Sequence, residues 1–374
     1  MKRILWLVPV FLFSLALSGC GSLRAEAGEI EQLRVIQVMG LDTAPGGAVR
    51  VTLASVETAA SPRKPICLSA TGPSISAAIG RIRELSLEED LFCGHIQCLL
   101  VGQEAAQAGL GPFLAYVCRS PDLRLDTPLY IVRDGTAEDL MTQAGKEDLS
   151  VSSLLQTVEA KIARQAGGTE LTAGKIAGDL ARQDAALACA LTLRAASEDD
   201  PVLTAAYGGL AVFQQGSLRG FLEPENSLGA WLLLGGAGPQ ELVVRGRTGE
   251  TATLELTDGS CQLLPVWEEG QLKGLQIFAS VGASVLETGD GSAVDSAYAD
   301  LLTSQLEAAV SEKLGAVLQI SRQLPADFLG LGTRVEQASP RAWREMGLGF
   351  SSQLPELEIS IAVRGQLRHT NDSK

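Results

Sequence analysis

Positive charge is scarce in this sequence, and its scarcity limits what the protein can bind. Lysine and arginine total 30 residues against 44 aspartates and glutamates, which gives a net charge of −14 at pH 7. No basic stripe interrupts this acidic excess. An acidic surface repels phosphate backbones and is not drawn to anionic lipid. Binding to nucleic acid is therefore disfavoured, and attachment to a membrane must use a covalent group or a partner.

Histidine is almost missing, since the chain holds only His95 and His369. His95 lies between Cys93 and Cys98, but on a strand positions 93 and 95 share one face while 98 points to the other. A metal site needs several converging ligands. A Ser-His-Asp or Cys-His site could use only His95 in the folded body, and no G-x-S-x-G elbow precedes a helix. We expect no metal, no cofactor and no catalysis, and a packed His95 with satisfied hydrogen bonds.

The sequence also has no C-x-x-C pair. Beyond Cys20 there are six cysteines: Cys67, Cys93, Cys98, Cys118, Cys189 and Cys261. An oxidising compartment permits disulfides, but the neighbours of these cysteines are apolar. We expect mostly buried free thiols, with the pairing of any disulfide left open.

Only the first residues form a long apolar run. Lys2 and Arg3 precede the uncharged stretch 4–17, which is shorter than the roughly 20 residues that a spanning helix needs. It predicts a signal peptide over residues 1–19. A spanning anchor and a secreted free cysteine at position 20 are the alternatives.

The end of this run carries a lipid-attachment signal. Leu17-Ser18-Gly19-Cys20 resembles the bacterial lipobox, in which the cysteine thiol receives a diacylglyceryl group and cleavage follows before that cysteine. Two acyl chains give stable anchoring. Residues 20–28 then form a lipidated tether, and we expect the protein at the outer face of the cell membrane.

Hydrophobic periodicity predicts a mixture of strands and helices along the rest of the chain. Strands are expected over 33–41, 48–56, 95–102, 128–135, 186–195 and 356–367, with a strand–turn–strand unit in 208–224 and four β-runs over 241–286. Helices are expected after Ser74 and Thr136 and over 150–165, 171–183, 226–236 (capped by Asn226) and 293–324. The polar stretch 195–201 predicts a break between subdomains.

These elements predict an α+β fold of mixed, largely antiparallel sheets with packed helices, in three subdomains. The expected boundaries are 29–200 for the N-terminal region (29–143 for the first subdomain and 144–200 for the start of the middle one), 201–270 for the β-rich remainder of the middle subdomain, and 271–370 for the C-terminal subdomain.

Several short motifs together resemble one family. They are Cys20, Glu29-Ile30, Gly40-Leu41-Asp42, Gly72–Ile75, Gly94-His95-Ile96-Gln97, Ser120–Pro128, Gly209–Phe213, Asp327–Gly332, Pro340-x-x-Trp343 and Leu354–Leu357. In this order they resemble the Ger(x)C family, the germinant receptor C-subunit lipoproteins of spore-forming bacteria. Gly21-Ser22 and Gly28 depart from the family pattern, which weakens a subgroup assignment more than the family itself.

The resemblance implies a three-domain mixed α/β lipoprotein on the outer face of the spore inner membrane. It implies a non-enzymatic subunit that works beside A- and B-type multi-pass membrane subunits, in a receptor for small nutrients. The matching motif positions, with structural or interface roles, are Gly94, His95, Gln97, Arg124, Asp126, Pro128, Gly209 and Trp343. A structural role is favoured, since Arg124 and Asp126 can lock a turn and Trp343 can staple a loop to the core.

Two other functions remain open. A substrate-binding lipoprotein of a transporter needs two α/β lobes around a cleft, and the β-runs at 241–286 disfavour it. A cell-surface hydrolase needs a nucleophile paired with His95.

We expect the mature protein to begin at Cys20 and to carry a diacylglyceryl group on that residue, because the small residues before it directly follow the apolar run. Mass spectrometry of the protein from membranes measures both features. An unmodified thiol at Cys20, or an uncut leader, would contradict the prediction.

Overall fold

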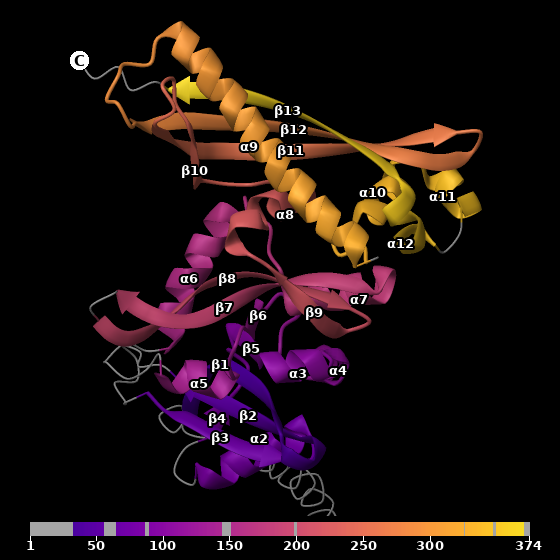
Figure 1. The fold of residues 1–374 in the computed structure, drawn as a ribbon. Helices are drawn as coiled ribbons and strands as arrows, with labels where there is room; N and C mark the ends of the chain where they lie inside the picture. Colours follow the sequence, from indigo (N-terminus) through magenta and orange to yellow (C-terminus); the bar gives the residue numbers. More distant parts are fainter. Residues whose placement is uncertain are drawn as a thin grey trace, which may run out of the picture.

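The computed structural model describes residues 33–55, 65–86, 90–143, 151–197, 200–324, 326–346 and 349–369. Over these ranges the chain forms two β-sheets with helices packed against them (Figure 1), which confirms the predicted α+β class. The signal peptide predicted over residues 1–19 and the lipidated tether predicted over residues 20–28, with Cys20, lie outside the described residues. The boundaries between the three subdomains stay a prediction.

The first sheet has the order β3-β2-β1-β5-β6-β7-β8-β9, with β4 added beside β1. Its strands are β1 (Leu33–Ala44), β2 (Ala48–Ser55), β3 (Cys67–Gly72), β4 (Asp90–Phe92), β5 (Cys98–Gly102), β6 (Leu129–Val132), β7 (Ala185–Ser197), β8 (Asp200–Gln214) and β9 (Ser217–Leu222). The four strands β1, β5, β6 and β7 pair in parallel, while the hairpins on both flanks are antiparallel. The sheet is therefore mixed.

Helices cover both faces of this sheet. One face packs against α2 (Ile75–Leu85), α3 (Gln103–Ala108), α4 (Gly111–Arg119) and α7 (Ala173–Gln183). The other face packs against α5 (Ala137–Gln143) and α6 (Val151–Gln165). Ser74 begins α2 by accepting a hydrogen bond from the backbone N–H of Ala77, and Thr136 accepts one from Asp139, so both predicted helix starts are confirmed.

Two hairpins of this sheet bear on expectations from the sequence. The first hairpin is confirmed, because β1 and β2 pair around a short 3₁₀ turn, η3 (Pro45–Gly47). The boundary between subdomains expected at 195–201 stays a prediction, and strands β7 and β8 on its two sides belong to the same sheet. These strands form one antiparallel hairpin in which Ser197 pairs with Asp200.

A short helix links the two sheets. After η4 (Pro224–Asn226), α8 (Ser227–Leu234) has buried side chains all round, Trp231 among them. Asn226 precedes it but makes no side-chain capping bond, contrary to the sequence prediction. A Cβ placed on Gly229 would lie 2.3 Å from the carbonyl oxygen of Lys313 in α9 (Ser296–Gln323), so only glycine allows the two helices to approach this closely.

The second sheet has the order β10-β11-β12-β13. Its strands are β10 (Gln240–Arg245), β11 (Thr251–Glu268), β12 (Gln271–Thr288) and β13 (Glu358–His369). The four runs expected over 241–286 are in fact three strands, because β11 passes through Asp258 and Gly259 with an irregular register instead of turning there. Strand β13 pairs in parallel with β12.

The long helix α9 crosses the inner face of this sheet (Figure 1). It confirms the helix predicted over 293–324, and its buried side chains include Tyr298, Leu306 and Leu314. Shorter helices follow before β13: α10 (Leu331–Ala338), α11 (Pro340–Met346), α12 (Phe350–Gln353) and η5 (Leu354–Glu356).

Replacing Gly209 by alanine should destabilise the fold by about 2 kcal/mol or more. Gly209 has a φ of +90°, and a Cβ there would lie 2.0 Å from the carbonyl oxygen of Leu222. Gly220 lies on the paired strand with open space around it, so Gly220→Ala is the matched control and should cost about 1 kcal/mol or less. Urea unfolding followed by tryptophan fluorescence measures both, and equal losses would contradict the prediction.

Candidate functional site

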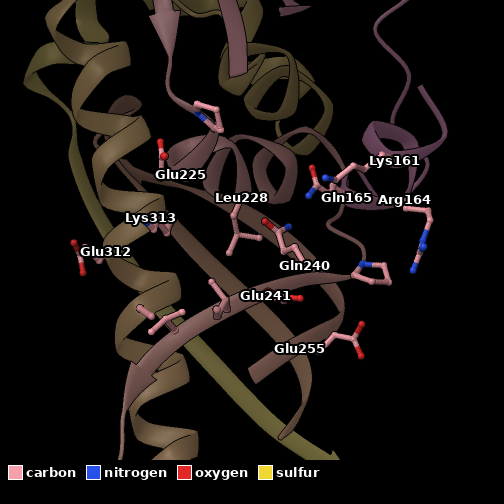
Figure 2. Close-up of a pocket in the computed structure, with 15 residues that line it drawn as sticks. Lys161, Arg164, Gln165, Glu225, Leu228, Gln240, Glu241, Glu255, Glu312 and Lys313 are labelled. Carbon is pink, nitrogen blue, oxygen red and sulfur yellow. The ribbon is translucent and has the colours of Figure 1, made fainter. Parts of the chain in front are cut away.

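A cleft of about 780 Å³ lies where the two sheets meet. Figure 2 shows its walls, which come from α6 on one side and from α9, α8 and the start of β10 on the other. Its lining carries charges of both signs, with Lys161 and Arg164 on α6 and Glu241 and Glu255 on the second sheet. The lining residues come from distant parts of the chain, and nothing in the local sequence pattern predicts this cleft.

A second hollow, of about 950 Å³, lies beside the first sheet, between β1, β2, α2 and α4. Its walls are mainly apolar, with Val49, Ile75 and Phe113 among them. Asp42 and Arg83 also line it. A mainly apolar hollow with a few polar groups has the general make-up of a small-molecule site.

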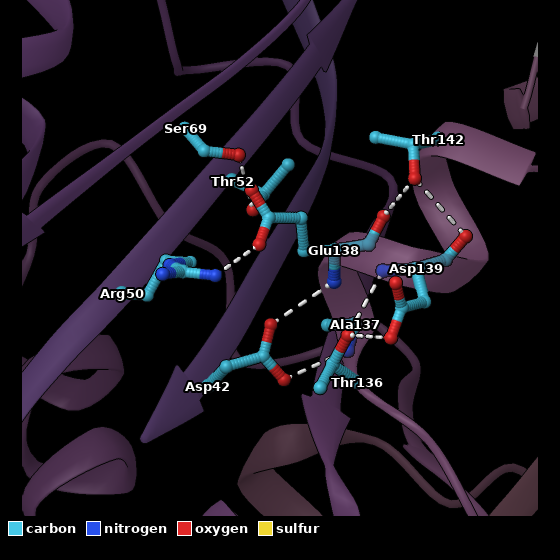
Figure 3. Close-up of polar contacts among 9 residues, drawn as sticks. All are labelled: Asp42, Arg50, Thr52, Ser69, Thr136, Ala137, Glu138, Asp139 and Thr142. Atoms are coloured by element: carbon cyan, nitrogen blue, oxygen red, sulfur yellow. Dashed lines mark hydrogen bonds and ion pairs between the residues drawn. The ribbon is translucent and has the colours of Figure 1, made fainter. Parts of the chain in front are cut away.

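Asp42 joins the end of β1 to the start of α5 (Figure 3). Its carboxylate accepts hydrogen bonds from the backbone N–H groups of Ala137, at 2.7 Å, and Glu138, at 3.0 Å. Burial raises the pKa of Asp42, although these two hydrogen bonds act in the opposite direction. Arg50 forms an ion pair with Glu138 beside it. A Cβ on Gly102 would lie 2.0 Å from Asp42 Oδ1, so the carboxylate fits only because residue 102 is glycine. Asp42 of the Gly40-Leu41-Asp42 motif therefore connects β1 to the start of α5.

His95 lies on an exposed turn between β4 and β5, so the packed histidine expected from the sequence is wrong. Its Nε2 is 3.2 Å from Nε2 of Gln97. The Gln97 backbone N–H donates to the carbonyl oxygen of Gln37 on β1, and its side-chain oxygen accepts from Gln156 on α6. A Cβ on Gly94 would lie 2.7 Å from the ring of Phe92. The Gly94–Gln97 turn therefore ties β1 to α6, and His95 contacts an amide and not a nucleophile.

Residues 120–128 run along the start of α7. Arg124 and Asp126 form a two-pronged ion pair, with contacts of 2.9 and 2.6 Å, on an exposed turn. This pair lowers the pKa of Asp126. The next residues connect to the helix, because the backbone N–H of Gly174 donates to the carbonyl oxygen of Leu125 and Pro128 bridges to Thr172. Residues 125–128 thus connect this loop to the start of α7. The Arg124–Asp126 ion pair stabilises the turn that comes just before them.

Gly209 stands at an irregularity in β8, next to a polar contact that the sequence analysis did not predict. Arg133 makes two hydrogen bonds of 2.8 Å to the carboxylate of Glu223 and lies over the ring of Phe221, 4.9 Å from its centre. It also donates to the carbonyl oxygen of Gly208. These contacts join the end of β6 to β8 and to the segment that enters α8. The two partners are 90 residues apart, so no local pattern could have paired them.

Asp327 and Trp343 organise the short helices before β13. The buried Asp327 carboxylate accepts hydrogen bonds from the backbone N–H groups of Leu331, at 2.8 Å, and Gly332, at 2.7 Å. Burial raises the pKa of Asp327 to about 7. Trp343 packs 5.8 Å from the ring of Phe350, and a Cβ on Gly332 would lie 3.0 Å from the Trp343 ring.

The motif positions are therefore not brought together in one site. The Gly94–Gln97 turn, the Arg124–Asp126 turn and Pro128, the bulge at Gly209 and the cluster at Trp343 each connect different elements. None of them lines the cleft between the sheets. Their contacts connect elements of the fold to one another.

The six described cysteines differ in their exposure. Cys93, Cys98 and Cys189 are buried, as expected, whereas Cys67 and Cys118 are exposed and Cys261 is half-buried; all six are free. Burial raises the pKa of Cys189 to about 12, so this thiol stays protonated at neutral pH. Among the described residues, no group of three or more His, Cys, Asp or Glu side chains is placed to hold a metal ion.

Comparison with known proteins gives two family matches along the chain. Residues 26–191 match the spore germination protein N-terminal domain, and residues 208–371 match the spore germination B3/GerAC-like C-terminal domain. The solved structure of the GerBC protein is similar in fold, with a TM-score of 0.59 and 14% sequence identity over 88% of this chain and 97% of that one. No curated protein matches the chain.

The raised pKa of Asp327 predicts that part of the stability is lost as the pH rises from about 4 to about 7. The unfolded state releases this proton near the ordinary aspartate pKa of 3.8, whereas the folded state keeps it until the pH reaches about 7. Between these two pH values, ionisation therefore favours the unfolded state. Each unit of difference is worth about 1.4 kcal/mol.

Asp327→Asn removes the titrating group and should flatten this loss, whereas Asp300→Asn, on an exposed position of α9, should keep the pH dependence of the parent protein. Urea unfolding at pH 5 and pH 7.5 gives the comparison. The same slope in Asp327→Asn and in the parent protein would contradict the assignment.

Proposed function

Because the chain belongs to the spore germination GerAC-like family, whose N- and C-terminal domains it matches in order over residues 26–191 and 208–371, we propose that it is the C-type subunit of a nutrient germinant receptor. The pair of domain matches is the observation that carries this proposal. The receptor responds to small nutrients, and this chain acts in it as an assembly or signalling subunit.

The proposed role is non-enzymatic. The motif positions Gly94, His95, Gln97, Arg124, Asp126, Pro128, Gly209 and Trp343 act as structural joints. The support for this is their contacts, which are backbone carbonyls, amides, an exposed ion pair and an aromatic neighbour. Fixed connections between the elements of the fold suit an assembly subunit, because rigid elements keep an interaction surface in position for its partners.

The proposed location is the outer face of the spore inner membrane, through a diacylglyceryl group on Cys20. None of the helices in the described part of the chain is both long enough and apolar enough to cross a bilayer. Support for the anchor comes from the lipobox-like residues 17–20. Two acyl chains suffice for stable attachment, and confinement to the membrane plane raises the effective concentration of this subunit near its partners.

The proposed partners are the A- and B-type membrane subunits of the receptor, with a small nutrient acting through the complex. Titration of small nutrients onto the isolated chain separates this proposal from that of a transporter's substrate-binding lipoprotein, for which tight binding by the chain alone is expected. His95→Ala separates it from a hydrolase, because a catalytic histidine could not be removed without loss of function.

We expect the full-length protein, extracted with detergent from spore membranes, to co-purify with A- and B-type subunits. Cys20→Ala should reduce this recovery at least about tenfold, because the chain loses its lipid and is no longer confined to the membrane plane. Cys118→Ala, at another exposed cysteine, is the matched control and should co-purify as the parent does. Quantitative mass spectrometry of the eluate measures the recovery.

Two outcomes would contradict the proposal. Absence of any multi-pass receptor subunit from the parent eluate would contradict the receptor role. Unchanged membrane association of Cys20→Ala would contradict the lipid anchor while leaving the receptor role standing.

A further inference from the structure

Strand β10 forms an open edge of the second sheet. It pairs with β11 through the register Gln240↔Leu256 to Arg245↔Thr251, and no other described strand pairs with it. Four consecutive residues, Gln240 to Val243, line the cleft between the two sheets. Since successive side chains of a strand point to opposite faces, a run of consecutive lining residues means that the strand's edge itself borders the cleft (Figure 2).

An edge of this kind offers backbone hydrogen bonds. In an antiparallel pair, alternate residues direct their N–H and C=O groups away from the partner strand, and such a row is a template for another strand. Among the described residues, the backbone bonds recorded for residues 240–245 run to β11. The Nε2 atom of Gln240 is buried and has no hydrogen-bond partner. The strand contains no proline or lysine, and its charged residues are Glu241 and Arg245.

The opposite edge of the same sheet is better protected. On β13 the carboxylate of Glu307, from α9, accepts a hydrogen bond of 2.9 Å from the backbone N–H of Gly365. At β10, by contrast, Val243 is 69% exposed, the highest value among the large apolar side chains exposed in the described chain. The sheet therefore leaves β10 as the edge with an uncovered apolar side chain.

The charges beside β10 indicate what would pair with it. Glu241 and Glu255 are direct cross-strand partners, and like charges in this position destabilise a sheet. No ion pair to a described residue offsets either one. A basic side chain on an added strand would lie next to this pair. The cationic residues Lys161 and Arg164 stand across the cleft on α6, apart from the strand (Figure 2).

We propose that β10 is a docking edge that accepts an extended segment of a partner polypeptide as a fifth strand, with basic side chains on the face of Glu241 and Glu255 and small apolar side chains on the face toward α9. Main-chain hydrogen bonds supply the affinity and the alternating side chains supply the specificity. A second copy of this chain is the alternative occupant, because antiparallel pairing of two β10 strands about Val243 would place Arg245 of one copy opposite Glu241 of the other, and the experiment below separates the two. The inference depends on this edge alone and not on the proposed receptor role.

The test uses the full-length protein in detergent and a short acetylated, fluorescent peptide in which lysine and valine alternate. Fluorescence polarisation measures affinity, and hydrogen exchange locates the site. We expect the peptide to bind and to slow exchange in residues 240–245. Methylation of alternate peptide nitrogens on the pairing side should weaken binding at least about tenfold, because it removes N–H donors without altering the protein.

Variants of the chain complete the test. Glu241→Lys should weaken binding of the lysine peptide at least about tenfold and should favour a peptide in which glutamate replaces lysine. Glu358→Lys, on the opposite edge strand of the same sheet, is the matched control and should leave the affinity within about twofold of the parent.

Four results would overturn the inference. They are no binding at millimolar peptide, equal binding of the N-methylated peptide, equal loss in Glu358→Lys, and a protein dimer that Glu241→Lys alters. The last result would make a second copy the occupant. None of them bears on the co-purification experiment, which tests the receptor role separately.

Discussion

Burial of α8 on every side is the constraint that joins this molecule into one body. An ordinary surface helix has one apolar stripe, but α8 presents Leu228, Trp231 and Leu232 around its whole circumference, so each of its faces must be covered by protein. The first sheet, α9 and β11 provide that cover, and one continuous apolar core runs from the first sheet through α8 to the second. Burying a single large apolar side chain contributes roughly 1.5–3 kcal/mol, so the two sheets are held by a shared core and not by a linker. The cleft lies beside this junction, and Leu228 of α8 forms part of its lining.

Buried carboxylates at helix starts are a recurring device in this fold. Asp42 binds the first N–H groups of α5 and Asp327 those of α10, and each lies against a glycine that leaves room for the carboxylate. A helix start carries unpaired N–H groups and partial positive charge, which suits a carboxylate. Burial nevertheless raises the pKa of both carboxyls. Two of the short motifs behind the family resemblance therefore reflect how loops are fastened to helices.

Local features were predictable from the sequence because their causes are local. The β1–β2 hairpin, the caps at Ser74 and Thr136 and the long stripe of α9 all follow from neighbouring residues. The parallel order β1-β5-β6-β7 and the Arg133–Glu223 contact depend on distant segments meeting, which periodicity does not encode. Asp258-Gly259 looked like a turn, but pairing with β12 on one side keeps β11 extended through it. The exposure of His95 was not predicted for the same reason, because the exposure of a side chain depends on which distant segments pack against it.

The parallel pairing of β13 with β12 bears on how the chain reaches its final state. Strands β11 and β12 are joined by a tight turn at Glu269 and Gly270, so this hairpin can form at once. Strand β13 must wait until α9 and the short helices after it have been laid across the sheet, and such distant contacts carry a large loop-closure cost. Until β13 joins the sheet, the side chains of Ile359 and Ile361 are not packed against the apolar core. While β13 is unpaired, the edge of β12 that it covers stays open to pairing with another chain.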